Sequence, residues 1–142
     1  MVAQFEDAGI SLKYPENWKL EREESESGWT ISLYSPETAF LMLSLREDMP
    51  SLDTLAETAL EALREEYPDL ESEECLGSLA GQPTIGYDIR FFSLDLTNTC
   101  WVRCFYAAQG AVLLLCQFND LVGEKNEPVL RAICKSLQVE ED

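Results

Sequence analysis

The chain has 142 residues, is 46% hydrophobic, and carries 10 basic against 27 acidic residues for a formal net charge of −17. This length predicts one domain, residues 1–142, with a core that can fold without disulfides or metals. The acidic excess argues against binding to nucleic acid and to anionic membranes, because both require clustered Lys and Arg. The acidic residues are then interpreted as a means of solubility or of binding a basic protein partner. The expected partner is a protein that is basic or apolar.

The cysteines are odd in number, and four of the five fall inside apolar runs: Cys75, Cys100, Cys104, Cys116 and Cys134. This usage predicts free thiols in a reducing compartment, not a secreted disulfide framework. Residues 1–9 lack the basic and apolar regions of a signal peptide. The longest apolar run, Ala111–Cys116, is far shorter than the ~18 residues of a membrane helix. We therefore expect a cytoplasmic protein without membrane insertion.

The first part of the chain has the alternating pattern of half-buried strands. Ile10–Tyr14 alternates, Pro15-Glu16-Asn17 has turn chemistry, and apolar residues resume at Trp18. Ile10–Arg22 is therefore predicted to be a β-hairpin or a bend, followed by a solvated strand end and loop over Glu21–Gly28. Two further strands are expected, of which the second is apolar on both faces and should lie inside a sheet: Trp29–Tyr34 and Ala39–Leu45.

The hydrophobic period changes over Ser51–Tyr67, where apolar residues recur at helical spacing. The stripe consists of Leu52, Leu55, Ala56, Ala59, Leu60 and Leu63. Ser51 is a plausible N-cap, and Pro68 ends the helix because proline disfavours helical backbone at the residue before it. The opposite face is rich in glutamate and is expected to face solvent.

The second half of the chain should contain four strands and a closing helix. Glu71–Leu79 is predicted as an irregular strand that ends in an Ala80-Gly81-Gln82 turn. Three apolar runs then predict adjacent antiparallel strands at the sheet centre: Pro83–Phe92, Thr99–Ala107 and Ala111–Asn119. We expect a hairpin turn at Gln109-Gly110, a polar connection over Leu121–Asn126, a helix over Pro128–Leu137 and a fraying tail at Glu140-Glu141-Asp142. The fold class is α+β, with a single antiparallel sheet of about six to eight strands and two main helices.

The central strands present two apolar faces. The Trp101 face holds Trp101, Arg103, Phe105, Ala107, Val112, Leu114, Cys116 and Phe118. The Cys100 face holds Cys100, Val102, Cys104, Tyr106, Leu113 and Leu115. The helices could cover one face each or share a face. We expect the Cys100 face to lie under the helices and the Trp101 face to be open, because aromatic residues and arginine typify interface hot spots. The predicted binding residues are Trp101, Arg103, Phe105 and Phe118.

Two interpretations of Arg103 remain open. Its stem can pack on the aromatic residues while its head reaches water or a carboxylate, or it can recognise an anion in a pocket.

Several catalytic chemistries are excluded by residue content. The chain has no histidine, no Gly-rich phosphate loop, no nucleophile elbow and no CxxC motif. Cys100 and Cys104 lie ~13 Å apart if they are on a strand, too far for a disulfide or a shared metal. Glu71, Glu73 and Glu74 could hold a divalent cation weakly or form a solvated face. We predict no catalytic residue, no metal site and no cofactor.

The run Ile-Ser-Leu-Lys-Tyr-Pro-Glu-Asn-Trp at Ile10–Trp18 resembles the entry of PsbP-like domains. The closing helix at Glu127–Leu137, which ends in Ser136-Leu137, resembles theirs as well. This family is named for an extrinsic subunit of photosystem II and includes a Ran-binding import factor and small bacterial effector chaperones. The resemblance implies an antiparallel sheet flanked by helices and mainly non-catalytic roles. No family binding motif matches residue by residue, so no site is implied.

These observations favour a non-catalytic protein-binding module, such as an adaptor or chaperone. One alternative is a small-molecule binder or enzyme with a cleft over the central sheet, where Arg103, Asp88 or Tyr106 would make polar contacts. Another alternative is a structural homodimer subunit.

Overall fold

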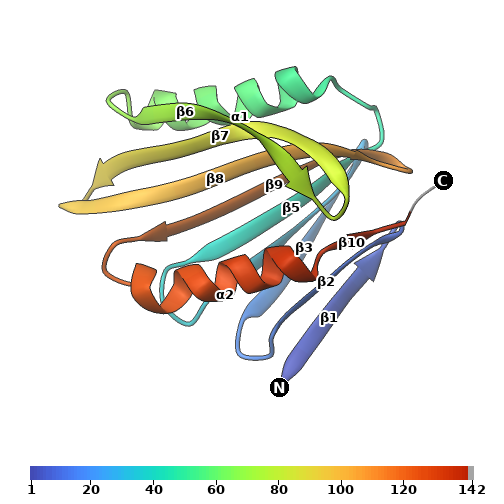
Figure 1. Cartoon of the computed structure of the whole chain (residues 1–142), viewed down its shortest axis with the longest axis horizontal. Coiled ribbons are helices and arrows are strands. Elements are labelled where there is room, and N and C mark those ends of the chain that lie inside the picture. The colour runs from blue at the N-terminus through green and yellow to red at the C-terminus, as the bar shows by residue number, and fades with distance from the viewer. Residues whose placement is uncertain (141–142) are drawn as a thin grey trace.

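The computed structural model describes residues 1–140 and has an α+β architecture (Figure 1). A long twisted antiparallel sheet runs through the molecule, and the helices lie on its two sides. This arrangement confirms the predicted fold class. The expected fraying of Glu141 and Asp142 lies outside the described residues. Glu140, the first residue of the predicted fraying tail, is bound to the turn at Gly9, because its backbone N–H donates to the Gly9 carbonyl at 2.8 Å.

The main sheet contains seven strands. Their order across the sheet is β3 (Lys19–Ser25), β4 (Gly28–Tyr34), β5 (Phe40–Arg46), β9 (Gly110–Asn119), β8 (Leu96–Ala107), β7 (Gln82–Ser93) and β6 (Glu71–Leu79). All neighbouring pairs are antiparallel. The three apolar runs of the sequence are therefore adjacent strands, as predicted, and β9 lies in the middle of the sheet.

The β8–β9 register differs from the predicted one by two residues. Ala107 pairs with Gly110, so the turn is Ala108-Gln109 and not Gln109-Gly110. Each residue consequently faces a partner two positions away from the expected one. Trp101, for example, faces Cys116 and not Phe118. Because side chains alternate with a period of two, this shift leaves every residue on its predicted face.

A second, smaller sheet packs against the core on the Trp101 face of the main sheet. It contains β1 (Val2–Asp7), β2 (Ile10–Pro15) and β10 (Gln138–Val139). Because β2 and β3 belong to different sheets, Pro15–Trp18 forms a bend, which was one of the two predicted possibilities. β1 was not predicted, because only Phe5 among its residues is buried and its alternation is weak.

Helix α1 spans Leu52–Glu66 and begins as predicted, with the Ser51 hydroxyl accepting the Thr54 N–H at 3.1 Å. Helix α2 spans Gly123–Ser136, so it begins five residues before the predicted Pro128. The Asn119 side chain accepts the N–H groups of Leu121 and Val122 and fixes the chain just ahead of the helix. The polar first turns of α2 concealed its start in the sequence.

Each helix covers a different face of the main sheet, which corrects the expected open face. Helix α1 places Leu55, Ala56 and Leu60 on the Cys100 face. Helix α2 and the small sheet cover the Trp101 face with Leu130, Ile133, Ile10 and Leu12, among others. Phe105 is fully buried and Phe118 is 6% exposed. Tyr106, which we expected beneath a helix, is 43% exposed.

The two edges of the main sheet carry many charged residues, although the second half of β6 is more apolar and exposes Leu76. Edge strand β3 has the sequence Lys-Leu-Glu-Arg-Glu-Glu-Ser, and β6 begins Glu-Ser-Glu-Glu. Charged residues on edge strands discourage pairing with other chains. Over residues 1–140, neither helix is both long enough and apolar enough to cross a membrane.

Candidate functional site

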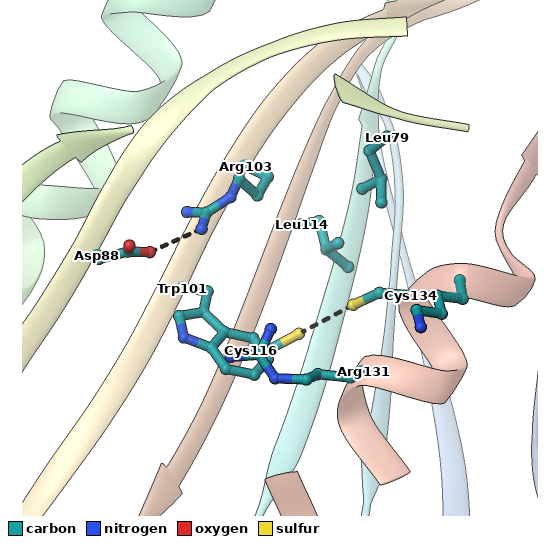
Figure 2. Close-up of a pocket in the computed structure, with 9 residues that line it drawn as sticks. Leu79, Asp88, Trp101, Arg103, Leu114, Cys116, Arg131 and Cys134 are labelled. Atoms are coloured by element: carbon teal, nitrogen blue, oxygen red, sulfur yellow. Dashed lines mark hydrogen bonds and ion pairs between the residues drawn. The ribbon is translucent and has the colours of Figure 1, made fainter. Parts of the chain in front are cut away.

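A hollow of about 410 Å³ lies between α2 and the Trp101 face (Figure 2). Helix α2 packs against β9 and β2, whereas Asp88 on β7 is exposed and Trp101 on β8 is half-buried, so this part of the face is only partly covered. The residues that line it come from the sheet and from α2: Leu79, Asp88, Trp101, Arg103, Leu114, Cys116, Arg131, Cys134 and Lys135. Three of these are cations, although the protein as a whole is strongly acidic.

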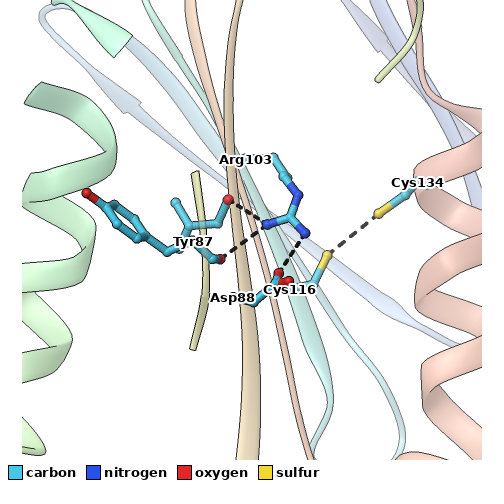
Figure 3. Close-up of polar contacts among 6 residues, drawn as sticks. Tyr87, Asp88, Arg103, Cys116 and Cys134 are labelled. Carbon is cyan, nitrogen blue, oxygen red and sulfur yellow. Dashed lines mark hydrogen bonds and ion pairs between the residues drawn. The ribbon is translucent and has the colours of Figure 1, made fainter. Parts of the chain in front are cut away.

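Arg103 is held in a fixed position by three hydrogen bonds (Figure 3). Its Nη2 donates to Asp88 Oδ1 at 2.7 Å, and its Nη1 donates to the carbonyls of Val102 at 2.9 Å and Tyr87 at 3.2 Å. The Arg103 side chain is 22% exposed, so this anchoring orients the guanidinium at the edge of the hollow. The head of Arg103 thus reaches a carboxylate, as in the first of the two interpretations. Its guanidinium also borders the hollow.

Trp101 and Arg131 form the most prominent feature of the site. The Arg131 guanidinium carbon lies 4.5 Å from the centre of the Trp101 ring, and Arg131 Nε donates to Glu127 at 2.9 Å. The Trp101 ring also packs edge-on against Phe118 with centroids 5.4 Å apart. A cation over an aromatic face is attracted by the quadrupole of the ring. The stack therefore joins α2 to β8 while both side chains keep solvent contact.

A second hollow, of about 480 Å³, adjoins the first and shares Asp88, Trp101 and Arg131 with it. Its other lining residues are Glu71, Ser72, Glu73, Ile89, Arg90 and Thr99. We call the two hollows together the α2 trough. In its first half the cations outnumber the one carboxylate: Arg103, Arg131 and Lys135 against Asp88. In its second half the carboxylates outnumber the cations: Glu71, Glu73 and Asp88 against Arg90 and Arg131. The trough is therefore polarised along its length, with the Trp101–Arg131 stack between the halves.

Two thiols form part of the wall of the first hollow. Cys116 Sγ on β9 and Cys134 Sγ on α2 are 3.7 Å apart, and both are free thiols. The hydrogen bond from Cys116, with a smaller contribution from the charges of Arg103 and Arg131, lowers the pKa of Cys134. The same hydrogen bond, together with burial, raises the pKa of Cys116. Cys134 is consequently the sulfur that ionises first.

The predicted binding residues divide into two groups. Trp101 and Arg103 meet at the α2 trough, whereas Phe105 and Phe118 lie in the core, where Phe118 supports the Trp101 ring. Arg131 was not predicted. The sequence did contain a signal for it. On a helix, Arg131 and Lys135 lie one turn apart, next to the buried Leu130. Within residues 1–140, no three metal-ligating side chains converge on one point.

A separate groove of about 560 Å³ runs along α1 on the Cys100 face. It is mostly apolar and is lined by Phe40, Met42, Arg46, Leu55, Thr58, Ala59, Ala62, Leu63, Glu66, Tyr67, Leu113, Leu115 and Gln117. It has none of the clustered cations of the α2 trough.

No protein-family model matches the chain, and no curated protein matches it by sequence. Solved structures do match it. A Bacteroides thetaiotaomicron protein is similar over 98% of this chain at 14% identity and a TM-score of 0.62, and the chain spans 48% of that protein. LpqN of Mycobacterium tuberculosis, which is involved in cell envelope biogenesis, is 15% identical with a TM-score of 0.55 over 99% of this chain and 92% of its own.

The cyanobacterial PsbP of Synechocystis sp. PCC 6803 is 10% identical to this chain, with a TM-score of 0.62. The similarity covers 98% of this chain and 92% of the cyanobacterial protein. At such identities the shared property is the arrangement of strands and helices. The chain therefore has the PsbP-like α+β fold that the resemblance of its entry run and closing helix predicted.

Proposed function

We propose that this chain is a non-catalytic protein-binding module and that the α2 trough is its contact surface. The observation that carries the proposal is the partly exposed Trp101–Arg131 stack, flanked by hollows of different charge. Tryptophan and arginine are the residue types that dominate binding energy at protein interfaces. A function as an adaptor or chaperone in the cytoplasm belongs to the same proposal.

The charges of the trough define the partner segment. The first half, with Arg103, Arg131 and Lys135, suits a carboxylate. The second half, with Glu71 and Glu73, suits a basic side chain. An extended peptide with an acidic and a basic residue on either side of an apolar one would satisfy both halves and cover Trp101. The net charge of −17 would accelerate encounter with a basic partner.

Selection from a phage-displayed random peptide library tests this proposal. We expect the wild type to enrich peptides with an acidic, apolar, basic order, and we expect Trp101→Ala and Arg131→Ala to weaken their binding by at least about tenfold. Arg64→Ala is the matched control, because Arg64 is also exposed on a helix and pairs with a glutamate one turn earlier, Glu61. Arg64 lies on α1, away from the trough.

The proposal fails if no peptide is enriched, or if Arg64→Ala and Arg131→Ala weaken binding equally. Equal losses would mean that the net charge alone, and not the trough, determines binding.

A small-molecule binder is the second candidate, favoured by the size of the first hollow. About 410 Å³ lies within the range of ligand sites, and its cations select carboxylates. A panel of mono- and dicarboxylate metabolites should then include one that raises the melting temperature of the wild type, since a ligand of the native state stabilises it. The same compound should not stabilise Arg131→Ala.

A homodimer is the third candidate, favoured by the apolar groove along α1. Light scattering at high concentration tests it, since a monomer mass at every concentration would exclude a second copy as the partner.

A further inference from the structure

We propose that Cys116 and Cys134 form a reversible disulfide when the protein meets a peroxide, which makes the pair an oxidative modification site. The inference does not depend on what the α2 trough binds. Both thiols line the first hollow, and their sulfurs are 3.7 Å apart (Figure 2). A disulfide requires an S–S distance of about 2.05 Å, so the sulfurs must approach each other by roughly 1.7 Å. Cys134 lies near the C-terminal end of α2, which is held to β9 by side-chain packing.

The positions of the five cysteines single out this pair. Cys100 and Cys104 lie on the opposite face of the main sheet, fully buried beneath α1. Cys75 lies on edge strand β6. Only Cys116 and Cys134 combine a nearby sulfur partner with a place on the wall of a solvent-connected hollow.

The electrostatics divide the roles between the two thiols. Arg103 and Arg131 border the same hollow, and they favour the thiolate of Cys134. Cys116 is only 1% exposed, and its hydrogen bond to Cys134 together with burial raises the pKa of its thiol (Figure 3). The thiolate is the reactive form of cysteine. Cys134 is therefore the attacking sulfur, and Cys116 is the resolving one.

The reaction takes two steps. The Cys134 thiolate attacks one oxygen of hydrogen peroxide, the O–O bond breaks, and the released hydroxide takes up a proton to become water. Cys134 is now a sulfenic acid. The Cys116 sulfur, losing its proton, attacks the Cys134 sulfur, and the S–O bond breaks to release a second water. The two thiols lose two electrons and two protons in total, and the peroxide is reduced to two waters. A dithiol reductant reverses the bond by exchange.

Peroxide titration of the full chain followed by mass spectrometry tests the inference. With one equivalent of hydrogen peroxide, we expect the intact mass to fall by about 2 Da, the loss of two hydrogens. Digestion without reductant should yield one cross-linked peptide that contains Cys116 and Cys134. Dithiothreitol should restore the starting mass. This part uses only the wild type, so it does not depend on whether a variant folds.

Single substitutions then separate the two roles. In Cys116→Ser, the sulfenic acid on Cys134 has no resolving thiol, so dimedone should label Cys134. In Cys134→Ser, dimedone labelling of Cys116 should be at least about tenfold slower, since the buried thiol ionises poorly. Cys75→Ser is the matched control and should keep the cross-link. Circular dichroism confirms that each variant is folded, and Cys116→Ala replaces Cys116→Ser if the hydroxyl disrupts the core.

Three results would overturn the inference. The first is the absence of any cross-link at one equivalent of peroxide. The second is a cross-link that contains Cys75. The third is equal labelling of Cys116 and Cys134 in the two single variants, which would remove the assignment of Cys134 as the attacking sulfur.

Discussion

Cys100 and Cys104 are ionisable groups placed where their charged form is strongly disfavoured. Both are fully buried against α1, and burial raises the pKa of each thiol to about 12. In the unfolded chain a thiol ionises near pH 8.5. The folded state therefore retains protons that the unfolded state loses above that pH, and stability falls as pH rises from about 8.5 toward 12.

We predict that the double variant Cys100→Ala/Cys104→Ala loses less stability at alkaline pH than the wild type. Urea unfolding at pH 7.5, 9 and 10 provides the measurement. The wild-type free energy of unfolding should decline more steeply, by up to about 1.4 kcal/mol per pH unit for each buried thiol. Other titrating groups affect both proteins alike, so parallel curves would contradict the prediction.

Single residues were assigned correctly to sheet faces wherever alternation alone decides the answer. The sets containing Trp101 and Cys100 survived a two-residue error in register, because side-chain direction repeats every two residues. Alternation does not, however, predict which of the two faces is exposed to solvent. Whether Phe105 is buried depends on where α2 packs, and no pattern within β8 carries that information.

At the scale of elements, the β7–β8 pairing depends on a glycine. An ideal Cβ built at Gly86 would overlap the Val102 carbonyl on β8, whereas one at Gly77 on β6 would meet only the Thr84 hydroxyl at 3.7 Å. Backbone atoms cannot move aside as a flexible side chain can. Gly86 is thus required for the close approach that brings Asp88 and Arg103 to neighbouring positions on one face.

We predict that Gly86→Ala destabilises the protein by roughly 3 kcal/mol or more, while Gly77→Ala changes stability by less than about 0.5 kcal/mol. Both glycines lie within strands of the same sheet, so Gly77→Ala controls for the general effect of adding a methyl group. Urea unfolding at pH 7.5 measures both. A small effect at Gly86 would show that β7 and β8 can separate without loss of the fold.

Elements with a strong apolar period were predicted well, and those with a weak one were not. The stripe of α1 and its Ser51 cap are local signals, and both were found. The start of α2 was missed because its first turns are polar and Pro128 suggested a later beginning. Arg131 lies inside the predicted helix, but its role was missed for another reason: its position over Trp101 depends on where α2 packs on the sheet.

At the scale of the whole molecule, the net charge of −17 is an energetic cost. Like charges repel in the compact state, and salt weakens this repulsion because the Debye length shrinks from about 30 Å at 0.01 M to about 3 Å at 1 M. We predict that the melting temperature rises by at least about 3 °C between 0.01 M and 1 M NaCl, which corresponds to about 1 kcal/mol for a chain of this size. A fall would mean that the surface ion pairs outweigh the repulsion.

Urea unfolding followed by two methods tests whether residues 1–142 form one domain. Tryptophan fluorescence reports the α2 side of the sheet through buried Trp18 and Trp29 and half-buried Trp101, and far-UV circular dichroism reports the whole chain. A single domain should give coincident urea transitions by both methods. Two separated midpoints would contradict the expected single domain.

The charged edges of the main sheet have a consequence for how a partner can attach. Binding modes in which a peptide extends a sheet as an additional strand require an accessible edge backbone with tolerant side chains. Here a visiting strand would align with Glu21, Glu23 and Glu24 on β3, or with Glu71, Glu73 and Glu74 on β6. Such a strand would need matched basic residues simply to offset the repulsion. The charged stretches of these two edges therefore disfavour the backbone-mediated growth that leads to fibres.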